Sequence, residues 1–159
     1  MSALLREPHL LLPMSVDELD AVLAIETIAY SFPWSRGNFI DSLAAGYVAR
    51  VLLDQSGRLI GYFVAMEGVD EMHLLNLTVA PAEQGQGHAR RMLDALVAIC
   101  RERHAAQLWL EVRESNSRAR ALYLRYGFRH VGVRRDYYPA EFGRREDATV
   151  MSLVLEGVA

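Results

Sequence analysis

The chain has 159 residues, of which 52% are hydrophobic, and a formal net charge of −3 at neutral pH. This length suits one domain with a full core, and the acidic balance excludes a global basic field that would attract nucleic acid. All 17 basic residues are arginines, which excludes a lysine in a phosphate-binding loop, in a Schiff base or as a general base.

The N-terminal region predicts neither a membrane span nor a signal peptide. No apolar run reaches the roughly 20 residues that a transmembrane helix needs. The leucines near the start are interrupted by Glu7, Pro8 and His9, which is not typical of a secretory signal. We therefore expect residues 1–8 to be a flexible tail, residues 9–159 to form one domain, and the protein to be cytoplasmic and independent of membranes.

The first third of the chain predicts a short strand followed by two helices. Residues 10–13 form the strand. Ser15 and Glu18 have the spacing of a capping box and begin a helix that continues to about Tyr30. After an aromatic and proline-containing break, Ser35 is placed to cap the second helix.

The middle of the chain predicts three strands and a long helix. Residues 47–53 and 59–66 form a hairpin around a Gly-containing turn, and residues 72–79 form a further strand. The helix spans residues 88–104. Its one cysteine, Cys100, shares a face with apolar residues, which indicates a core position and leaves no internal disulfide.

The last third predicts a strand over residues 107–112, a helix over 116–126 that ends at Gly127, and strands over 128–138 and 149–155. Three predicted strands follow one another before the long helix and two more end the series, so helices do not alternate with every strand. The order predicts a single α/β (α+β) domain on a mixed sheet and excludes a doubly wound alternating fold.

The loop between Val79 and the long helix carries the strongest functional signal. Gly85 and Gly87 allow backbone turns that bring successive N–H groups close to a ligand. The helix that follows adds unpaired N–H donors and the positive end of its dipole. The loop is therefore expected to bind an anion, most naturally a phosphate.

Two familiar phosphate-binding motifs do not fit this loop. Arg90 stands where the dinucleotide fingerprint needs its third glycine, and the nucleoside-triphosphate loop needs a lysine. The remaining pattern is Gln84-x-x-Gly87-x-Ala89, which resembles the acyl-CoA pyrophosphate loop of the GNAT acetyltransferase superfamily. For this motif alone, an ordinary strand-to-helix turn is the alternative.

A second motif follows about thirty residues later and resembles the other signature of the GNAT superfamily. It reads Asn116-x-x-Ala119-x-x-Leu122-Tyr123-x-x-x-Gly127-Phe128. Further blocks resemble the bacterial ribosomal-protein-alanine N-acetyltransferases of the RimI type. They are Phe32-Pro33-Trp34-Ser35, Leu108-Trp109-Leu110-Glu111-Val112-Arg113, Arg134-Arg135-Asp136-Tyr137-Tyr138-Pro139 and Glu146-Asp147-Ala148.

The resemblance implies a GNAT-like domain that binds acetyl-CoA. Its central sheet is expected to be mixed, mostly antiparallel and splayed at the acetyl-CoA site, with about four flanking helices. Gly85 stands where relatives often carry a basic residue, and Arg90 and Arg91 are expected to supply that charge. The residues expected to bind the cofactor are Leu77, Thr78, Val79, Gly85, Gln86, Gly87, His88, Ala89, Arg90 and Asn116, although Asn116 is equally a helix N-cap.

Two residues are implied to catalyse the transfer. In RimI-type enzymes the glutamate that matches Glu111 accepts a proton from the amine, and the tyrosine that matches Tyr123 protonates the leaving thiolate. Without the resemblance, Glu111 reads as a solvated carboxylate paired with Arg113. Tyr123 reads as a helix aromatic packed beside Ala119 and Tyr126.

The resemblance also indicates the acceptor. Tyr30, Trp34, Tyr137 and Tyr138 are expected to bind a peptide, with an edge strand and a core position as the alternatives for the tyrosine pair and for Trp34. The expected partner is the N-terminal alanine of a ribosomal protein, and the basic character of such proteins suits this acidic chain. We expect a monomer or weak dimer, no direct nucleic-acid binding and no metal, because the five histidines lack ligand spacing.

The sequence therefore predicts an acetyl-CoA-dependent N-acetyltransferase that modifies the N-terminus of a protein. Two alternatives stay open. One is an acetyltransferase for small-molecule amines or lysine side chains on the same fold. The other is a CoA-binding module without catalysis.

Overall fold

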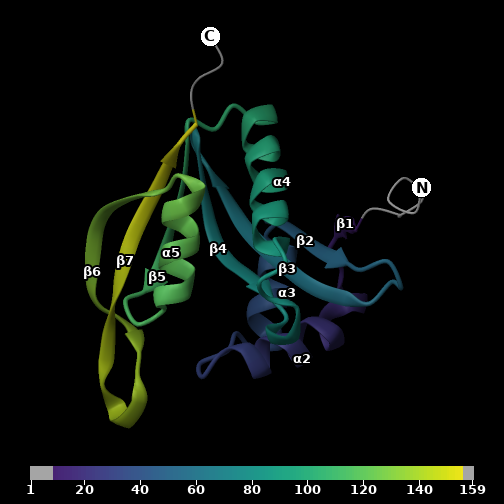
Figure 1. Ribbon diagram of the computed structural model, residues 1–159, viewed down its shortest axis with the longest axis horizontal. Helices are drawn as coiled ribbons and strands as arrows, with labels where there is room; N and C mark the ends of the chain where they lie inside the picture. Colours follow the sequence, from purple (N-terminus) through teal and green to yellow (C-terminus); the bar gives the residue numbers. More distant parts are fainter. Residues whose placement is uncertain (1–8, 156–159) are drawn as a thin grey trace. The chain divides into compact units, whose positions relative to one another are not determined.

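The computed structural model describes residues 9–155 and has its helices and strands in the predicted order (Figure 1). The expected flexible tail, residues 1–8, lies outside the described residues. The strands are β1 (Leu10–Pro13), β2 (Val48–Leu53), β3 (Leu59–Gly68), β4 (Glu71–Val79), β5 (Gln107–Arg113), β6 (Arg129–Pro139) and β7 (Arg145–Val154). The helices are α2 (Leu19–Ala29), α3 (Arg36–Ala44), α4 (His88–Glu102) and α5 (Ser117–Tyr126), with 3₁₀ turns η1 (Val16–Glu18), η2 (Pro81–Glu83) and η3 (Glu141–Gly143). No helix in this part of the chain is long and apolar enough to cross a membrane.

Within residues 9–155 the strands form one mixed sheet in the order β1-β2-β3-β4-β5-β7-β6. β4 and β5 run parallel, with Glu71 opposite Gln107 and Leu74 opposite Leu110. The pairs β1–β2, β5–β7 and β6–β7 are antiparallel. The parallel pair follows from the crossover through α4, since parallel neighbours need a long connection. The predicted mixed, mostly antiparallel sheet with four helices is confirmed.

The contacts within the chain group into two compact units. The N-terminal unit consists of residues 9–64 and 76–92, and the C-terminal unit consists of residues 65–75 and 93–155. β3, β4 and α4 each contribute residues to both units.

The N-terminal unit has a core of large apolar side chains. Leu19 and Val22 of α2, Phe39 of α3, and Tyr62 and Phe63 of β3 are all 0% exposed. Burying each such side chain stabilises the fold by about 1.5–3 kcal/mol. The 3.6-residue spacing on the helices and the apolar run of β3 therefore position the elements that carry the predicted cofactor loop.

Two predicted helix starts are present. At the first, the Ser15 N–H donates to Glu18 Oε1 over 2.7 Å, which completes the capping box. The box closes the 3₁₀ turn η1, so regular α-helix begins only at Leu19. At the second, Ser35 and Asn38 form the same reciprocal pair at the start of α3. These caps satisfy backbone donors that the helices themselves leave unpaired.

In the C-terminal unit, β5 alternates as predicted. Leu108, Leu110 and Val112 are at most 6% exposed and lie on one face. Trp109 and Glu111 lie on the other face, because successive side chains of a strand point to opposite sides. This alternation separates the core side chains from the candidate catalytic carboxylate.

Helix α4 carries the single cysteine into the core. Cys100 is fully buried with a free thiol, and burial raises its pKa to about 11. The predicted core position is confirmed, and the thiol is protonated at neutral pH. The helix ends at Glu102, two residues before the predicted end, and His104 has a left-handed backbone with φ of 60°.

Candidate active site

The predicted anion-binding loop has the backbone that its glycines suggest. Gly85 and Gly87 both have φ of 81°, a left-handed conformation that strains residues with a Cβ. A Cβ at Gly87 would meet nothing within 4 Å, so the backbone angle and not crowding requires glycine there. α4 begins at His88, and the Gly87 carbonyl accepts from the Arg91 N–H over 3.0 Å. The first N–H groups of the helix have no intrahelical acceptor and suit an anion.

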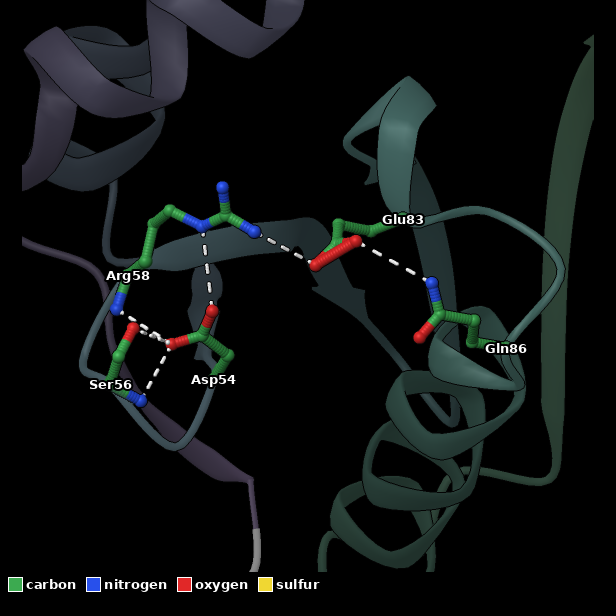
Figure 2. A network of polar contacts seen from close by, with 5 residues as sticks. All are labelled: Asp54, Ser56, Arg58, Glu83 and Gln86. Carbon is green, nitrogen blue, oxygen red and sulfur yellow. Dashed lines mark hydrogen bonds and ion pairs between the residues drawn. The ribbon is translucent and has the colours of Figure 1, made fainter.

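A polar network braces this loop (Figure 2). Asp54 Oδ1 accepts from the N–H and the hydroxyl of Ser56 and from the N–H of Arg58, which shapes the turn between β2 and β3. Arg58 Nη2 then donates to Glu83 Oε1 over 2.9 Å, and Gln86 Nε2 donates to Glu83 Oε2 over 3.5 Å. Arg58 thus balances the charge of a carboxylate beside the candidate phosphate site.

His88 is buried at the start of α4. Its Nδ1 lies 2.9 Å from Arg91 Nη1 and its ring centroid lies 5.0 Å from that of His9. Burial, and then the charges of His9 and Arg91, lower the pKa of His88. The imidazole is therefore neutral at neutral pH, and Nδ1 accepts a hydrogen bond from the Arg91 guanidinium, as only an unprotonated nitrogen can.

The end of β4 presents main-chain groups beside the loop. Val79 and Thr78 are buried, and Gln84 Nε2 donates to the Val79 carbonyl over 3.3 Å. The Ala80 N–H donates to the Ile60 carbonyl of β3 over 2.8 Å. Because backbone groups of alternate residues point to opposite edges of a strand, the N–H and carbonyl groups of Leu77 and Val79 point away from β3.

Tyr30 lies at the end of α2 against β4. Its hydroxyl lies 2.6 Å from Thr78 Oγ1 and 3.4 Å from the Leu77 carbonyl oxygen. Burial raises the pKa of Tyr30 to about 12, so the phenol keeps its proton at neutral pH. The structure thus places one predicted substrate residue directly against two predicted cofactor residues.

Trp34 is partly exposed and does not belong wholly to the core. Its ring centroid lies 5.1 Å from that of Phe39, and its backbone N–H donates to Glu26 Oε2 over 2.9 Å. The side chain also lines a cavity of about 390 Å³; the other lining residues are Asn38, Asp41, Ser42 and Tyr47.

Sequence reasoning missed one buried carboxylate in the N-terminal unit. Glu26 of α2 is 1% exposed, and its oxygens accept hydrogen bonds from the Trp34 N–H, the Tyr62 hydroxyl and the Asn76 amide. A fully buried glutamate is uncommon unless it is paired. Its sequence position, among apolar residues of a helix, gave no specific signal for this role.

Glu111 is more enclosed than a residue on the outer face of a strand suggests. Its side chain is 5% exposed, and Oε1 lies 2.8 Å from His73 Nε2 of β4. Oε2 lies 3.1 Å from Arg134 Nε of β6 without hydrogen-bond geometry. Among the described residues Oε2 accepts no hydrogen bond, which leaves a lone pair that can take a proton.

His73 is the second residue that sequence reasoning missed. Its ring stacks on Trp109 with 3.7 Å between centroids and an angle of 11° between planes. His73 and Trp109 are directly opposite each other in the parallel pair β4–β5. The stacking fixes the ring that contacts Glu111.

The alternative interpretation of Glu111 as a solvated carboxylate is wrong, since its side chain is 5% exposed. Arg113 Nη1 donates to Glu146 Oε1 over 3.0 Å and to the Pro139 carbonyl over 2.8 Å. Ser115 N–H donates to the other oxygen of Glu146 over 2.8 Å. Arg113 therefore contacts both strands of the β6–β7 hairpin, and Glu111 contacts His73 and Arg134.

Asn116 immediately precedes α5, and Tyr123 lies within the helix. Asn116 Oδ1 accepts from the Ala119 N–H over 3.1 Å and is the N-cap, as predicted. Tyr123 is 7% exposed, and its ring packs edge-on against Phe128 with 5.4 Å between centroids. The helix ends at Gly127, whose φ is 122°.

The tyrosine pair of β6 lies near the charged groups of the C-terminal unit. β6 is the edge strand beside β7 (Figure 1). Tyr137 is 41% exposed, and the Arg134 guanidinium lies 5.5 Å from its ring centroid. Tyr138 is less exposed, its pKa is raised by burial, and the Arg113 guanidinium lies 4.5 Å from its ring. Arg134 thus contacts both Glu111 and an exposed aromatic ring.

The candidate residues fall into two sets, one in each unit. The N-terminal unit contains Tyr30, Trp34, Leu77–Val79 and residues 85–90; the C-terminal unit contains Glu111, Asn116, Tyr123, Tyr137 and Tyr138. Over residues 9–155, no group of three or more His, Cys, Asp or Glu side chains could hold a metal ion.

Comparison with known proteins matches residues 19–128 to the model of the acetyltransferase (GNAT) family. A relative from Haemophilus ducreyi, named [ribosomal protein bS18]-alanine N-acetyltransferase, is 37% identical over 138 residues, which cover 87% of this chain and 94% of that protein. The protein of the same name from Escherichia coli (strain K12) is 39% identical over 140 residues, covering 88% and 93%.

The same resemblance holds for the solved structures. The crystal structure of the ribosomal-protein-S18-alanine N-acetyltransferase from Escherichia coli aligns with a TM-score of 0.86 and 35% identity. The alignment covers 96% of this chain and 97% of that one.

Proposed function

This chain belongs to the acetyltransferase (GNAT) family, and from that premise we propose that it acetylates the α-amino group of the N-terminal alanine of ribosomal protein bS18. The chain is an acetyl-CoA-dependent N-acetyltransferase. The specific acceptor is supported by relatives that carry this activity in their names and match nearly their full length. Such a protein acts where ribosomes and acetyl-CoA are present, so we propose that it is cytoplasmic. We also propose that it is a monomer or a weak dimer.

For the donor, we propose that the N–H groups of the loop bind the diphosphate of acetyl-CoA. The left-handed glycines and the start of α4 support this role for Gly85, Gln86, Gly87, His88, Ala89 and Arg90. The outward-pointing main-chain groups of Leu77 and Val79, on either side of Thr78, are suited to the amide groups of the pantetheine arm. We propose that the side chain of Asn116 also contacts acetyl-CoA.

The acceptor amine must lose a proton to attack the thioester carbonyl. An α-amino group has a pKa of about 7.7–8.0, whereas a lysine amine has one near 10.4, so the α-amine needs only modest help at neutral pH. We propose that Glu111 accepts this proton on Oε2, the oxygen that accepts no hydrogen bond among the described residues. The Arg134 guanidinium and His73 hold the carboxylate in place.

The reaction balances with one further proton transfer. As the amine nitrogen forms its bond to the carbonyl carbon, the bond from carbon to sulfur breaks and the thiolate leaves. We propose that the Tyr123 hydroxyl protonates this sulfur and is reprotonated from solvent. The edge-on contact with Phe128 fixes the ring, and the small exposed fraction keeps competing water low.

For the peptide, we propose contacts with Tyr30, Trp34, Tyr137 and Tyr138. These residues combine apolar surface with polar edges, a property that suits recognition of peptide segments. The exposed ring of Tyr137 and the partly exposed ring of Trp34 support this role.

The test is an assay with purified protein, acetyl-CoA and a peptide that begins with the N-terminal alanine of bS18. We expect acetylation of the α-amine. Turnover of a small amine or a lysine side chain in its place would indicate the other acetyltransferase class. Binding of acetyl-CoA without any turnover would indicate a non-catalytic module.

A further inference from the structure

A chain of hydrogen bonds runs through the N-terminal unit from the buried Glu26 to Tyr30. Asn76 Nδ2 donates to Glu26 Oε1 over 3.1 Å, and Thr78 Oγ1 donates to Asn76 Oδ1 over 2.7 Å. Tyr30 Oη completes the chain at 2.6 Å from Thr78 Oγ1. Glu26, Asn76 and Thr78 are at most 8% exposed, so water does not compete effectively for these bonds.

The proton positions along this chain are determined by its buried end. A carboxylate can only accept, so the amide nitrogen of Asn76 must face Glu26 and its oxygen must face Thr78. The single hydroxyl proton of Thr78 is therefore donated to Asn76. The short contact between Thr78 and Tyr30 then requires that the proton comes from Tyr30.

The other two partners of Glu26 also donate hydrogen bonds to it. The Trp34 N–H is an obligate donor at 2.9 Å from Oε2, and the Tyr62 hydroxyl lies 2.7 Å from Oε1. Burial and the Glu26 charge raise the pKa of Tyr62, so this hydroxyl also keeps its proton and donates. Every group around the carboxylate is thus a donor.

The far end of the chain presents two acceptors. The Tyr30 proton is committed to Thr78, which leaves the lone pairs of the phenol oxygen. The Leu77 carbonyl oxygen lies 3.4 Å away and points to the edge of β4 that faces away from β3. Among residues 9–155 the Tyr30 hydroxyl has no hydrogen-bond partner besides Thr78 and the Leu77 carbonyl. Tyr30 is also partly exposed.

We infer that Tyr30 Oη and the Leu77 carbonyl oxygen together accept an N–H donor of a substrate, and that Glu26 is a positioning residue that fixes this polarity through Asn76 and Thr78. The inference rests on the proposed function, which supplies two N–H sources: the α-amine of the acceptor peptide and an amide of the pantetheine arm. A hydroxyl free to rotate would instead present its proton to the ligand for part of the time and repel an N–H group.

The test compares Thr78→Val with Thr78→Ser. Valine has the shape of threonine but lacks the hydroxyl that accepts the Tyr30 proton. That proton then turns to the Leu77 carbonyl, and the pair of acceptors formed by Tyr30 Oη and the Leu77 oxygen is lost. Serine keeps the hydroxyl. We expect Thr78→Val to weaken binding of one substrate about tenfold, with little change in kcat, and Thr78→Ser to restore most of that loss. Thermal unfolding of both variants identifies a temperature at which each is folded, and binding and kcat are measured at that temperature.

The two N–H sources give different results. An increase in KM for a peptide with an N-terminal alanine identifies the α-amine, and an increase in the Kd of acetyl-CoA in a calorimetric titration identifies the pantetheine amide. Tyr30→Phe should give the same loss, and the Tyr30→Phe/Thr78→Val double variant should lose no more than either single variant, because both changes act on one contact.

Failure of the inference is distinct from failure of the proposed function. Unchanged KM and Kd in folded Thr78→Val, alongside normal turnover by the natural protein, would overturn the inference alone. Additive losses in the double variant would also overturn it. Absence of peptide acetylation by the natural protein would instead count against the proposed function. The Kd of acetyl-CoA for the Thr78 variants would still test the direction in which the Tyr30 hydroxyl donates its proton.

Discussion

His73 Nε2 lies 2.8 Å from Glu111 Oε1, and the two residues come from neighbouring parallel strands. The histidine ring is held by its stack on Trp109. The contact leaves Glu111 Oε2 beside Arg134 and without a hydrogen bond from any described residue. His73 thus holds one carboxylate oxygen, and the other is buried beside Arg134 and accepts no hydrogen bond from a described residue.

Replacing Glu111 by glutamine tests its role as proton acceptor. Glutamine keeps the size and a polar oxygen but cannot take the proton, so we expect kcat to fall by about 10²–10⁴-fold. The Kd of acetyl-CoA should change little. Steady-state kinetics and a calorimetric titration check the two values, and an unchanged kcat would assign the base to another residue.

Replacing His73 by phenylalanine separates stacking from hydrogen bonding. Phenylalanine can still pack on Trp109, but it offers no nitrogen to Glu111 Oε1. A poorly oriented catalytic group costs up to about 10²-fold in rate, and we expect kcat to fall by roughly tenfold or more.

Glutamine at position 73 is the matched control, because its amide can donate to Glu111. Partial recovery of kcat in His73→Gln relative to His73→Phe is expected. Equal rates in both variants and in the natural protein would show that His73 does not position the carboxylate.

The sequence predicted most of the fold because local patterns were strong. The capping boxes at Ser15 and Ser35 and the alternation along β5 each depend on residues close together in the chain. The loop glycines likewise predicted backbone turns, and both have a left-handed backbone in the structure. Local patterns of this kind also carried the resemblance to the acetyltransferase family.

The contacts of Glu111 and Glu26 could not be predicted in the same way. His73 is 38 positions from Glu111, and Asn76 is 50 positions from Glu26. Such pairs depend on strand register and on the packing of a helix against a sheet, which periodicity does not determine. A carboxylate that looked solvated on the outer face of β5 is therefore enclosed by residues from two other strands.

Replacing Gly87 by alanine tests the backbone of the anion loop. An added Cβ meets no atom within 4 Å but must adopt φ of 81°, which costs about 1–2 kcal/mol. We expect the loop to relax and the Kd of acetyl-CoA to rise about tenfold or more.

Gly46→Ala provides the matched control. Gly46 has φ of 79° and equally open surroundings but lies just after α3, outside the loop. The control should lose comparable stability and keep the affinity of the natural protein. Equal affinities in both variants would argue against diphosphate binding by residues 85–90.

His88 predicts a pH dependence of stability. Its pKa is lowered in the folded protein by burial, His9 and Arg91, whereas the unfolded chain has the ordinary value of about 6.5. As the pH falls below about 6.5, the unfolded state takes up a proton that the folded state resists, so the free energy of unfolding decreases.

His88→Gln removes this titration but keeps an acceptor for Arg91. Urea unfolding of both proteins near neutral pH and at mildly acidic pH measures the effect. We expect a smaller loss of stability on acidification in the variant. An identical loss in both proteins would mean that His88 titrates normally in the fold.

The most direct test of the central claim is mass spectrometry of a peptide that carries both an N-terminal alanine and an internal lysine, after incubation with the protein and acetyl-CoA. The chain itself has no lysine, so an acetylated lysine can come only from the peptide. We predict a single acetyl group on the α-amine. Acetylation of the lysine alone, or an unmodified peptide in the presence of bound acetyl-CoA, would contradict the proposed function.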